Sequence, residues 1–108
     1  MKLLSNLEEI FLLAIIRLGD NAYGVTIREE VSKATGESWS LGAIYDPLYR
    51  LESKGLIRSY PSRSTPERGG RSKRMFEIRP EGAQALLAHK RVRDGLWRRV
   101  GTAVVESK

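Results

Sequence analysis

The apolar side chains in the first half of the chain recur every three or four residues, which is the spacing of one face of an α-helix. This pattern predicts three helices, over residues 5–18, 23–34 and 41–54. Ser5 and Glu8 have the spacing of a capping box, which satisfies two free amides at a helix start. Gly19 and Gly36 follow the first two segments as expected helix stops. The chain therefore begins with three short helices joined by turns.

The third predicted helix contains a proline, and its start can be placed in two ways. We favour one kinked helix that begins at Leu41 behind the Ser40 cap, although Pro47 inside it costs about 3 kcal/mol. In the alternative, Asp46 caps the helix and Pro47 lies in its first turn. Residues 41–45 would then form a separate turn.

After residue 55 the pattern changes to that of short strands. Residues 56–60 and 73–78 predict the two strands of a hairpin, and residues 61–72, rich in Ser, Pro, Gly and Arg, form its long tip. Pro80 then opens a last helix, which we expect to reach about residue 105 unless Gly95 or Gly101 ends it. The predicted fold is mostly α with a two-stranded antiparallel wing: a winged helix-turn-helix followed by a long C-terminal helix.

The charge of the chain is concentrated on this hairpin. The 108 residues suit one domain and carry a formal net charge of +6. Residues 58–79 contain seven basic and two acidic side chains, so they account for five of the six units. A basic segment of this kind is typical of a nucleic-acid contact, although an ordinary exposed loop can have the same composition.

Several function classes are excluded. The sequence has no cysteine, which removes disulfide scaffolds, cysteine-ligated zinc and thiol nucleophiles. His89 is the only histidine, and we expect it exposed on the last helix, so we predict no metal or cofactor. No motif indicates catalysis, so we predict no enzyme. The most apolar stretch, residues 10–16, is too short to cross a bilayer, and the N-terminus lacks a signal-peptide pattern. We therefore expect a cytoplasmic protein with no membrane partner.

The order of the predicted elements indicates the partner. A helix fits the major groove of B-DNA and presents side chains to base edges. A hairpin beside that helix carries cations to the neighbouring phosphates. The sequence thus predicts a reader of double-stranded DNA. The alternatives are a nucleic-acid binder without sequence preference and a winged helix used as a protein-interaction module.

Four motifs in order and register resemble the PadR family of winged-helix transcriptional regulators. They are Tyr23-Gly24, the Gly-x-x-Tyr-x-x-Leu-x-Arg-Leu-Glu run of residues 42–52, Lys54-Gly55-Leu56, and the Gly-Gly-Arg stretch that leads into an aromatic strand. The resemblance covers about residues 5–88. The chain departs from it at two positions: Asp46 stands where many members have proline, and Arg79 stands where the last helix usually has a threonine cap.

The resemblance implies a homodimeric regulator, expected to be a repressor, that binds a roughly palindromic operator and is released by a small aromatic effector. Residues 1–79 would form the winged helix-turn-helix DNA-binding domain, and residues 80–108 would form the C-terminal dimerisation helix of the same compact unit. The predicted dimer and effector interface consists of Phe11, Leu96, Trp97, Val100 and Val104. Trp97 has two interpretations, an anchor of the dimer core or a contact for a flat ligand.

The DNA-contact residues are predicted at the starts of the second and third helices and on the hairpin. They are Tyr23, Thr26, Ser38, Ser40, Gly42, Ala43, Tyr45, Arg63, Arg68, Arg71, Lys73 and Arg74. Gly42 and Ala43 are small enough to permit close approach to a phosphate. Two members have a structural alternative: Tyr45 as a core residue, and Ser40 as a helix cap only.

Overall fold

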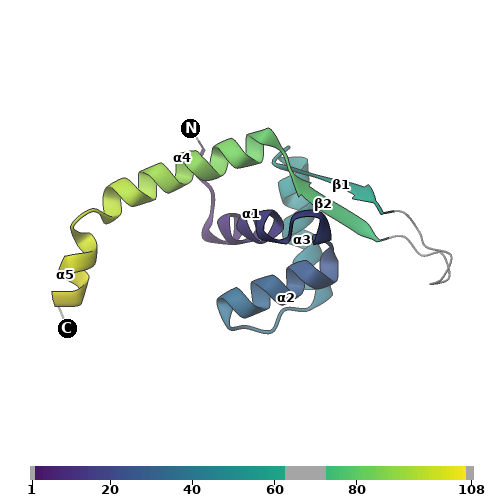
Figure 1. Ribbon diagram of the computed structural model, residues 1–108, viewed down its shortest axis with the longest axis horizontal. Helices are drawn as coiled ribbons and strands as arrows, with labels where there is room; N and C mark the ends of the chain where they lie inside the picture. The colour runs from purple at the N-terminus through teal and green to yellow at the C-terminus, as the bar shows by residue number, and fades with distance from the viewer. Residues whose placement is uncertain (1, 63–72, 107–108) are drawn as a thin grey trace.

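Three short helices form the body of the molecule, a two-stranded hairpin projects from one end, and two C-terminal helices extend toward the other (Figure 1). The computed structural model describes residues 2–62 and 73–106. The molecule is elongated, with principal dimensions of 58 × 30 × 20 Å. No helix in these two ranges is long and apolar enough to cross a membrane.

The first helix, α1 (Asn6–Leu18), begins at the predicted capping box. The Glu8 amide donates to the Ser5 hydroxyl (3.1 Å), and the Ser5 amide donates to the Glu8 carboxylate (2.8 Å). At the other end of α1, Gly19 has a φ of 58° and starts a single 3-10 turn, η1 (Gly19–Asn21). This part of the prediction is confirmed, including both ends of the helix.

The helix-turn-helix consists of α2 (Gly24–Thr35) and α3 (Leu41–Ser53). Gly36 ends α2 in the left-handed conformation, with a φ of 73°, and its amide donates to the Ser32 carbonyl. In the connecting segment, the Trp39 indole nitrogen donates to the Thr35 hydroxyl (3.1 Å). The connection between the two helices is thus fixed at both of its ends.

α3 is one continuous helix with Pro47 in its interior. The prediction of a single helix is confirmed, and the alternative start at Asp46 is wrong. Pro47 removes one backbone hydrogen bond, but its ring is buried. Burial of apolar surface therefore offsets part of the cost of the lost bond.

The hairpin consists of β1 (Ile57–Pro61) and β2 (Arg74–Ile78), paired antiparallel with Ser59 opposite Phe76. Each strand begins one residue later than predicted. The Glu52 carboxylate accepts hydrogen bonds from the Ser59 amide (3.1 Å) and hydroxyl (2.6 Å), which ties the end of α3 to β1. The other edge of β2 is also held, because the Phe76 amide donates to the Ala22 carbonyl (2.9 Å).

One core unites these elements. Its largest fully buried side chains come from α1, α2, α3 and both strands, and are Phe11, Phe76, Leu12, Ile15, Ile27, Ile44, Leu48, Leu51, Ile57 and Val31. The next helix, α4 (Pro80–Trp97), adds Leu86 to the core cluster. Arg79 gives α4 no side-chain cap, in line with the departure noted at this position. α4 is therefore attached to the body mainly along α1 (Figure 1).

The prediction of one C-terminal helix to about residue 105 is wrong. α4 ends at Trp97, and a separate short helix, α5 (Val100–Glu106), follows it. The break lies at Arg98 and Arg99 rather than at a glycine, and Arg99 has a φ of 67°. Side chains 93–100 are all exposed, so this part of the helix depends on local propensity, which Gly95 and Gly101 weaken by about 1 kcal/mol each.

Candidate nucleic-acid interface

Tyr23 caps the start of α2 at the turn that meets the wing. Its amide donates to the Thr26 hydroxyl oxygen (3.0 Å), and the Thr26 hydroxyl donates to the Asn21 carbonyl (2.5 Å). These two bonds close the turn in front of α2. Thr26, predicted as a DNA contact, therefore also has an internal role in positioning Tyr23.

The base of the wing lies directly against this turn. The Lys73 ammonium is 4.1 Å from the centre of the Tyr23 ring, within the range of a cation–π interaction. Tyr23 also forms an isolated antiparallel bridge with Met75 of β2. The structure thus brings together two predicted DNA-contact residues from segments 50 positions apart.

The N-terminus of α3 carries four more of the predicted residues. The Ser40 hydroxyl accepts a hydrogen bond from the Ala43 amide (3.1 Å), so Ser40 is the cap of α3. Gly42 and Ala43 are exposed in the first turn, and Ser38 is exposed in the segment before it. This surface combines small side chains with backbone amides at a helix start, which suits close approach of a phosphate.

Tyr45 joins α3 to the start of α2. The side chain is half-buried and packs against the core cluster. A Cβ atom at Gly24 would lie 2.3 Å from the Tyr45 hydroxyl oxygen, so the glycine makes room for the ring. The outer side of Tyr45 stacks on Tyr49, with ring centres 5.8 Å apart and planes inclined by 20°. Tyr45 therefore packs on the core with one part of its side chain and lies near the predicted DNA interface with the other.

The face of α3 opposite its buried stripe contains two side chains that the sequence analysis missed. The buried positions are Ile44, Pro47, Leu48 and Leu51. Asp46 and Tyr49 lie on the other side of the helix together with Gly42, and Tyr49 is 52% exposed. The signal was available: positions 42, 46 and 49 are four and three residues apart, which places them on one helical face.

Only part of the charged wing is described. Arg63, Arg68 and Arg71 lie outside the described residues. Lys73 and Arg74 are exposed at the start of β2. Arg58 is paired with Glu77 across the strands, so this cation of the basic segment is already neutralised.

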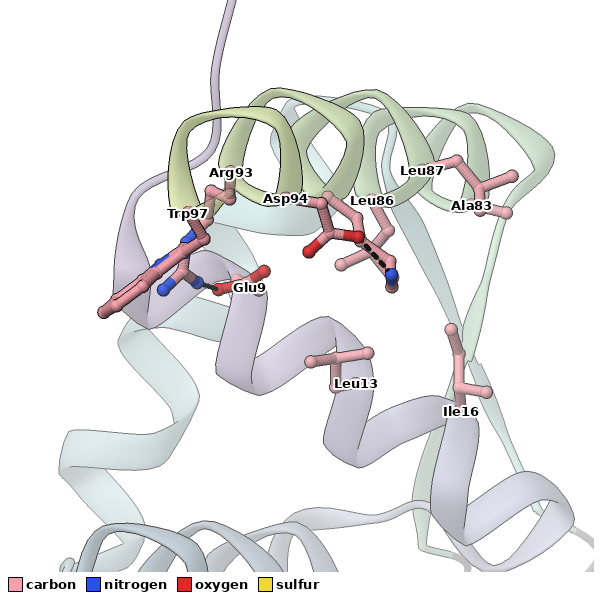
Figure 2. A pocket seen from close by; sticks show the side chains of 10 residues that line it. Glu9, Leu13, Ile16, Ala83, Leu86, Leu87, Arg93, Asp94 and Trp97 are labelled. Carbon is pink, nitrogen blue, oxygen red and sulfur yellow. Dashed lines mark hydrogen bonds and ion pairs between the residues drawn. The ribbon is translucent and has the colours of Figure 1, made fainter. Parts of the chain in front are cut away.

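A second candidate site is the apolar groove between α1 and α4, seen in Figure 2. We call it the α1–α4 groove. Its volume is about 600 Å³, and it is lined by Glu9, Leu13, Ile16, Ala83, Leu86, Leu87, Lys90, Arg93, Asp94 and Trp97. Leu13 and Ile16 point from α1 toward α4, and Trp97 closes one end beside the Arg93–Glu9 ion pair (Figure 2).

The structure corrects the predicted interface residues at this groove. Phe11 is 0% exposed inside the core, because it lies on the side of α1 that faces α2 and α3, so it forms no part of the exposed surface. Leu13 and Ile16, each 46% exposed, occupy the surface expected of Phe11. On the C-terminal helices, Leu96, Trp97, Val100 and Val104 are exposed as the predicted interface requires.

His89 is not the exposed residue that the sequence suggested. It is 7% exposed on the side of α4 that packs on α1, and its Nε2 atom lies 3.8 Å from the Glu9 carboxylate. Neither ring nitrogen has a hydrogen-bond partner within the described part of the chain. Glu9 is also paired with Arg93, which lies on α4 like His89. The described ranges contain no group of three His, Cys, Asp or Glu residues placed to hold a metal ion.

The helix-turn-helix, the wing against its turn and the exposed face of α3 together define a winged-helix DNA-binding protein. The model of the PadR-like family of transcriptional regulators matches residues 12–88. The chain belongs to this family, as its motifs suggested. Members of the family are transcription regulators and not enzymes, so the prediction of a non-enzymatic, DNA-binding regulator is confirmed.

Solved structures of similar proteins agree with this assignment. A PadR-like transcriptional regulator from Bacillus cereus has a TM-score of 0.68 and 25% identity, covering 93% of this chain and 88% of its own. A PadR family transcription regulator from Clostridium difficile has a TM-score of 0.61 and 25% identity, covering 92% and 95%. A Streptococcus transcriptional regulator has a TM-score of 0.69 and 25% identity, covering 90% of each chain. No curated protein sequence matches the chain significantly.

Proposed function

We propose that the protein is a homodimeric repressor that reads a roughly palindromic DNA operator. In this proposal residues 1–79 form the DNA-binding domain and residues 80–108 form the dimerisation segment. The observation that carries the proposal is the junction of Tyr23 and Lys73, which puts the wing beside the start of α2, while Tyr45 sets α3 next to the same turn. One surface then offers a helix for the major groove and cations for the adjacent phosphates.

The predicted DNA contacts are assigned to three elements in this proposal. The first turn of α3, with Gly42 and Ala43, approaches the major groove. Tyr23 at the start of α2 contacts the sugar-phosphate backbone of the DNA, and Thr26 holds Tyr23 in position through its hydrogen bond to the Tyr23 amide. Lys73 and Arg74 extend this contact along the wing, together with the predicted residues of its tip.

The proposed dimer forms through α1, α4 and α5. Its support is the exposed apolar surface of these helices: Leu87 is 54% exposed, Leu96 72% and Trp97 53%. Leu13, Ile16, Leu87 and Trp97 line the same α1–α4 groove. Contiguous exposed apolar side chains of this kind are typical of an interface rather than of a free protomer. A second copy of the chain, related by a two-fold axis, would cover it and place two α3 helices on successive turns of the duplex.

The proposed effector is a small, flat aromatic molecule that enters the α1–α4 groove. The support is the apolar lining of this groove and the indole of Trp97 at its end, which can stack on an aromatic ring. Binding there would shift α4 relative to α1, change the spacing of the two reading helices and so release the operator.

Two measurements test this proposal. Light scattering should give a mass of twice 12.2 kDa. In transcription reactions with purified polymerase, a promoter that overlaps a bound site should be silenced as protein is added, and a promoter with a scrambled site should be unaffected. A monomer that binds its site tightly would contradict the proposed dimer. Activation of the promoter would contradict the proposed repressor role.

A further inference from the structure

The exposed face of α3 carries a carboxylate that the DNA-binding role does not explain. Asp46 is exposed and shares a shallow hollow of about 570 Å³ with Gly42, Tyr49 and Arg50. The buried stripe of α3 lies on the opposite side of the helix. Duplex DNA carries one negative charge per about 1.7 Å of its axis, so a carboxylate on this face repels any duplex it does not specifically contact.

An internal ion pair does not account for Asp46. Arg50 lies one helical turn further on, where it could pair with the carboxylate, but no cation of the described residues lies within 4.0 Å of Asp46. Asp46 also makes no hydrogen bond that caps α3, because Ser40 fills that role. Its carboxylate oxygens are thus available on the surface of the reading helix.

The chemistry of the major groove indicates what such a group can contact. Guanine presents two acceptors there and thymine one, and each of these repels a carboxylate. Cytosine presents an N4 amino donor and no acceptor, so a carboxylate can accept a hydrogen bond from it, whereas adenine presents its N6 amino donor beside the N7 acceptor, which repels a carboxylate. Gly42, one turn before Asp46, has no atom of the described chain near the place of its missing Cβ, so the edge of a base pair can approach this part of the helix.

We propose that Asp46 is a specificity-determining residue, which accepts a hydrogen bond from the N4 amino group of a cytosine in each half-site and weakens binding to all other sequences. The proposal rests on the proposed function, because it requires α3 to lie in the major groove. It assigns to Asp46 two effects of opposite sign on the affinity for DNA: a gain for sites with the cognate cytosine and a loss for every other duplex. A carboxylate that stayed solvated without contacting a base would weaken binding to duplexes in general but would give no preference for cytosine.

The experiment is a parallel selection of bound duplexes from random DNA with the wild-type protein and three variants. Asp46→Ala removes the acceptor, and Asp46→Asn replaces a pure acceptor by an amide, which pairs with adenine. The matched control is Asp20→Asn, the same chemical change at an exposed carboxylate in η1, on the hollow between α1 and the hairpin. Circular dichroism of each variant confirms that it is folded, which is expected because both positions are exposed.

The proposal predicts that Asp46→Ala loses the preference for cytosine at one position of each half-site, where the wild type should discriminate by about 5- to 150-fold, the usual effect of one mismatched base pair. Asp46→Asn should shift that position toward adenine, and both variants should bind a scrambled duplex more tightly than the wild type does. Asp20→Asn should select the wild-type site. The inference is overturned if Asp46→Ala selects the wild-type site unchanged. If the wild-type protein enriches no sequence, the proposed function fails first, and this inference fails with it.

Discussion

The ammonium of Lys73 lies 4.1 Å from the centre of the Tyr23 ring. Lys73 directly precedes β2, and Tyr23 is the N-cap residue of α2, so this contact joins the wing to the start of α2. The cation is still exposed at this position. An ammonium over the face of an aromatic ring is attracted by the ring's quadrupole, which restricts the movement of the Lys side chain. The contact therefore fixes where a positive charge is presented relative to the helix-turn-helix.

Lys73→Met is expected to weaken binding to operator and unrelated duplexes by the same factor. Because one phosphate contact is lost, the slope of log affinity against log salt should become shallower by about 0.9. Fluorescence anisotropy titrations at several salt concentrations measure this slope. Arg58→Met is the matched control on the same hairpin. Because Arg58 is already paired with Glu77, the slope of log affinity against log salt should change little in this variant. Equal changes in the two variants would contradict the assignment of Lys73.

Gly82→Ala is expected to destabilise the fold. A Cβ atom at residue 82 would lie 2.2 Å from the Leu56 carbonyl oxygen, a backbone atom that cannot rotate away. Overpacking of this kind costs about 1–3 kcal/mol in the free energy of unfolding, which urea denaturation measures. Gly95→Ala on the same helix meets no atom within 4 Å, so it should be neutral or stabilising by up to about 1 kcal/mol. A Gly82→Ala variant as stable as the wild type would show that the start of α4 does not pack against the Leu56 carbonyl as the structure places it.

Acid should weaken the link between α1 and α3. Burial alone would raise the pKa of Glu8, but hydrogen bonds from Lys54 and the Ser5 amide and the charge of Lys54 outweigh it, so the pKa lies below the ordinary value of 4.5. A lowered folded-state pKa gives stability that is complete above pH 4.5 and is lost as the pH falls through the folded value. Urea unfolding from pH 7 to pH 3 should therefore show the gap between wild type and Glu8→Gln shrinking below pH 4.5. A gap that stays constant or widens on acidification would refute this role.

Leu87→Glu is expected to separate the proposed dimer into folded monomers. Leu87 is 54% exposed in the protomer, so a charge there disturbs an interface without entering the core. Light scattering measures the mass, and circular dichroism checks the fold. Val25→Glu on α2, where the side chain is 37% exposed and lies outside the α1–α4 groove, should leave the mass unchanged. A dimer that survives Leu87→Glu at micromolar concentration would place the interface elsewhere.

Local signals in the sequence predicted the elements that depend on local interactions. Ser5 and Glu8 gave the start of α1, because a capping box involves only neighbouring residues. The break at Arg99 could not be predicted, since it depends on the absence of tertiary packing along the end of α4 rather than on a strong helix stop. Helical periodicity ranks apolar faces but does not say which neighbour covers each of them.

Two side chains whose burial differs from the sequence prediction show that burial, unlike helix capping, depends on residues far away in the chain. Phe11 and Leu13 are both apolar residues of one helix, and only the three-dimensional packing buries the first and leaves the second 46% exposed. His89 lies next to Glu9, which is 80 positions away in the chain, so sequence neighbours gave no indication of its burial. Asp46 was treated as a departure from a motif, whereas its exposed place on α3 makes it a candidate for base recognition.

The central claim is that a symmetric pair of α3 helices reads DNA. A hydroxyl-radical footprint on a duplex selected from random sequence tests it most directly. The account predicts two protected patches on each strand, with centres about 10 base pairs apart and arranged around a two-fold axis. A single protected patch, or uniform protection that ignores the sequence, would contradict it.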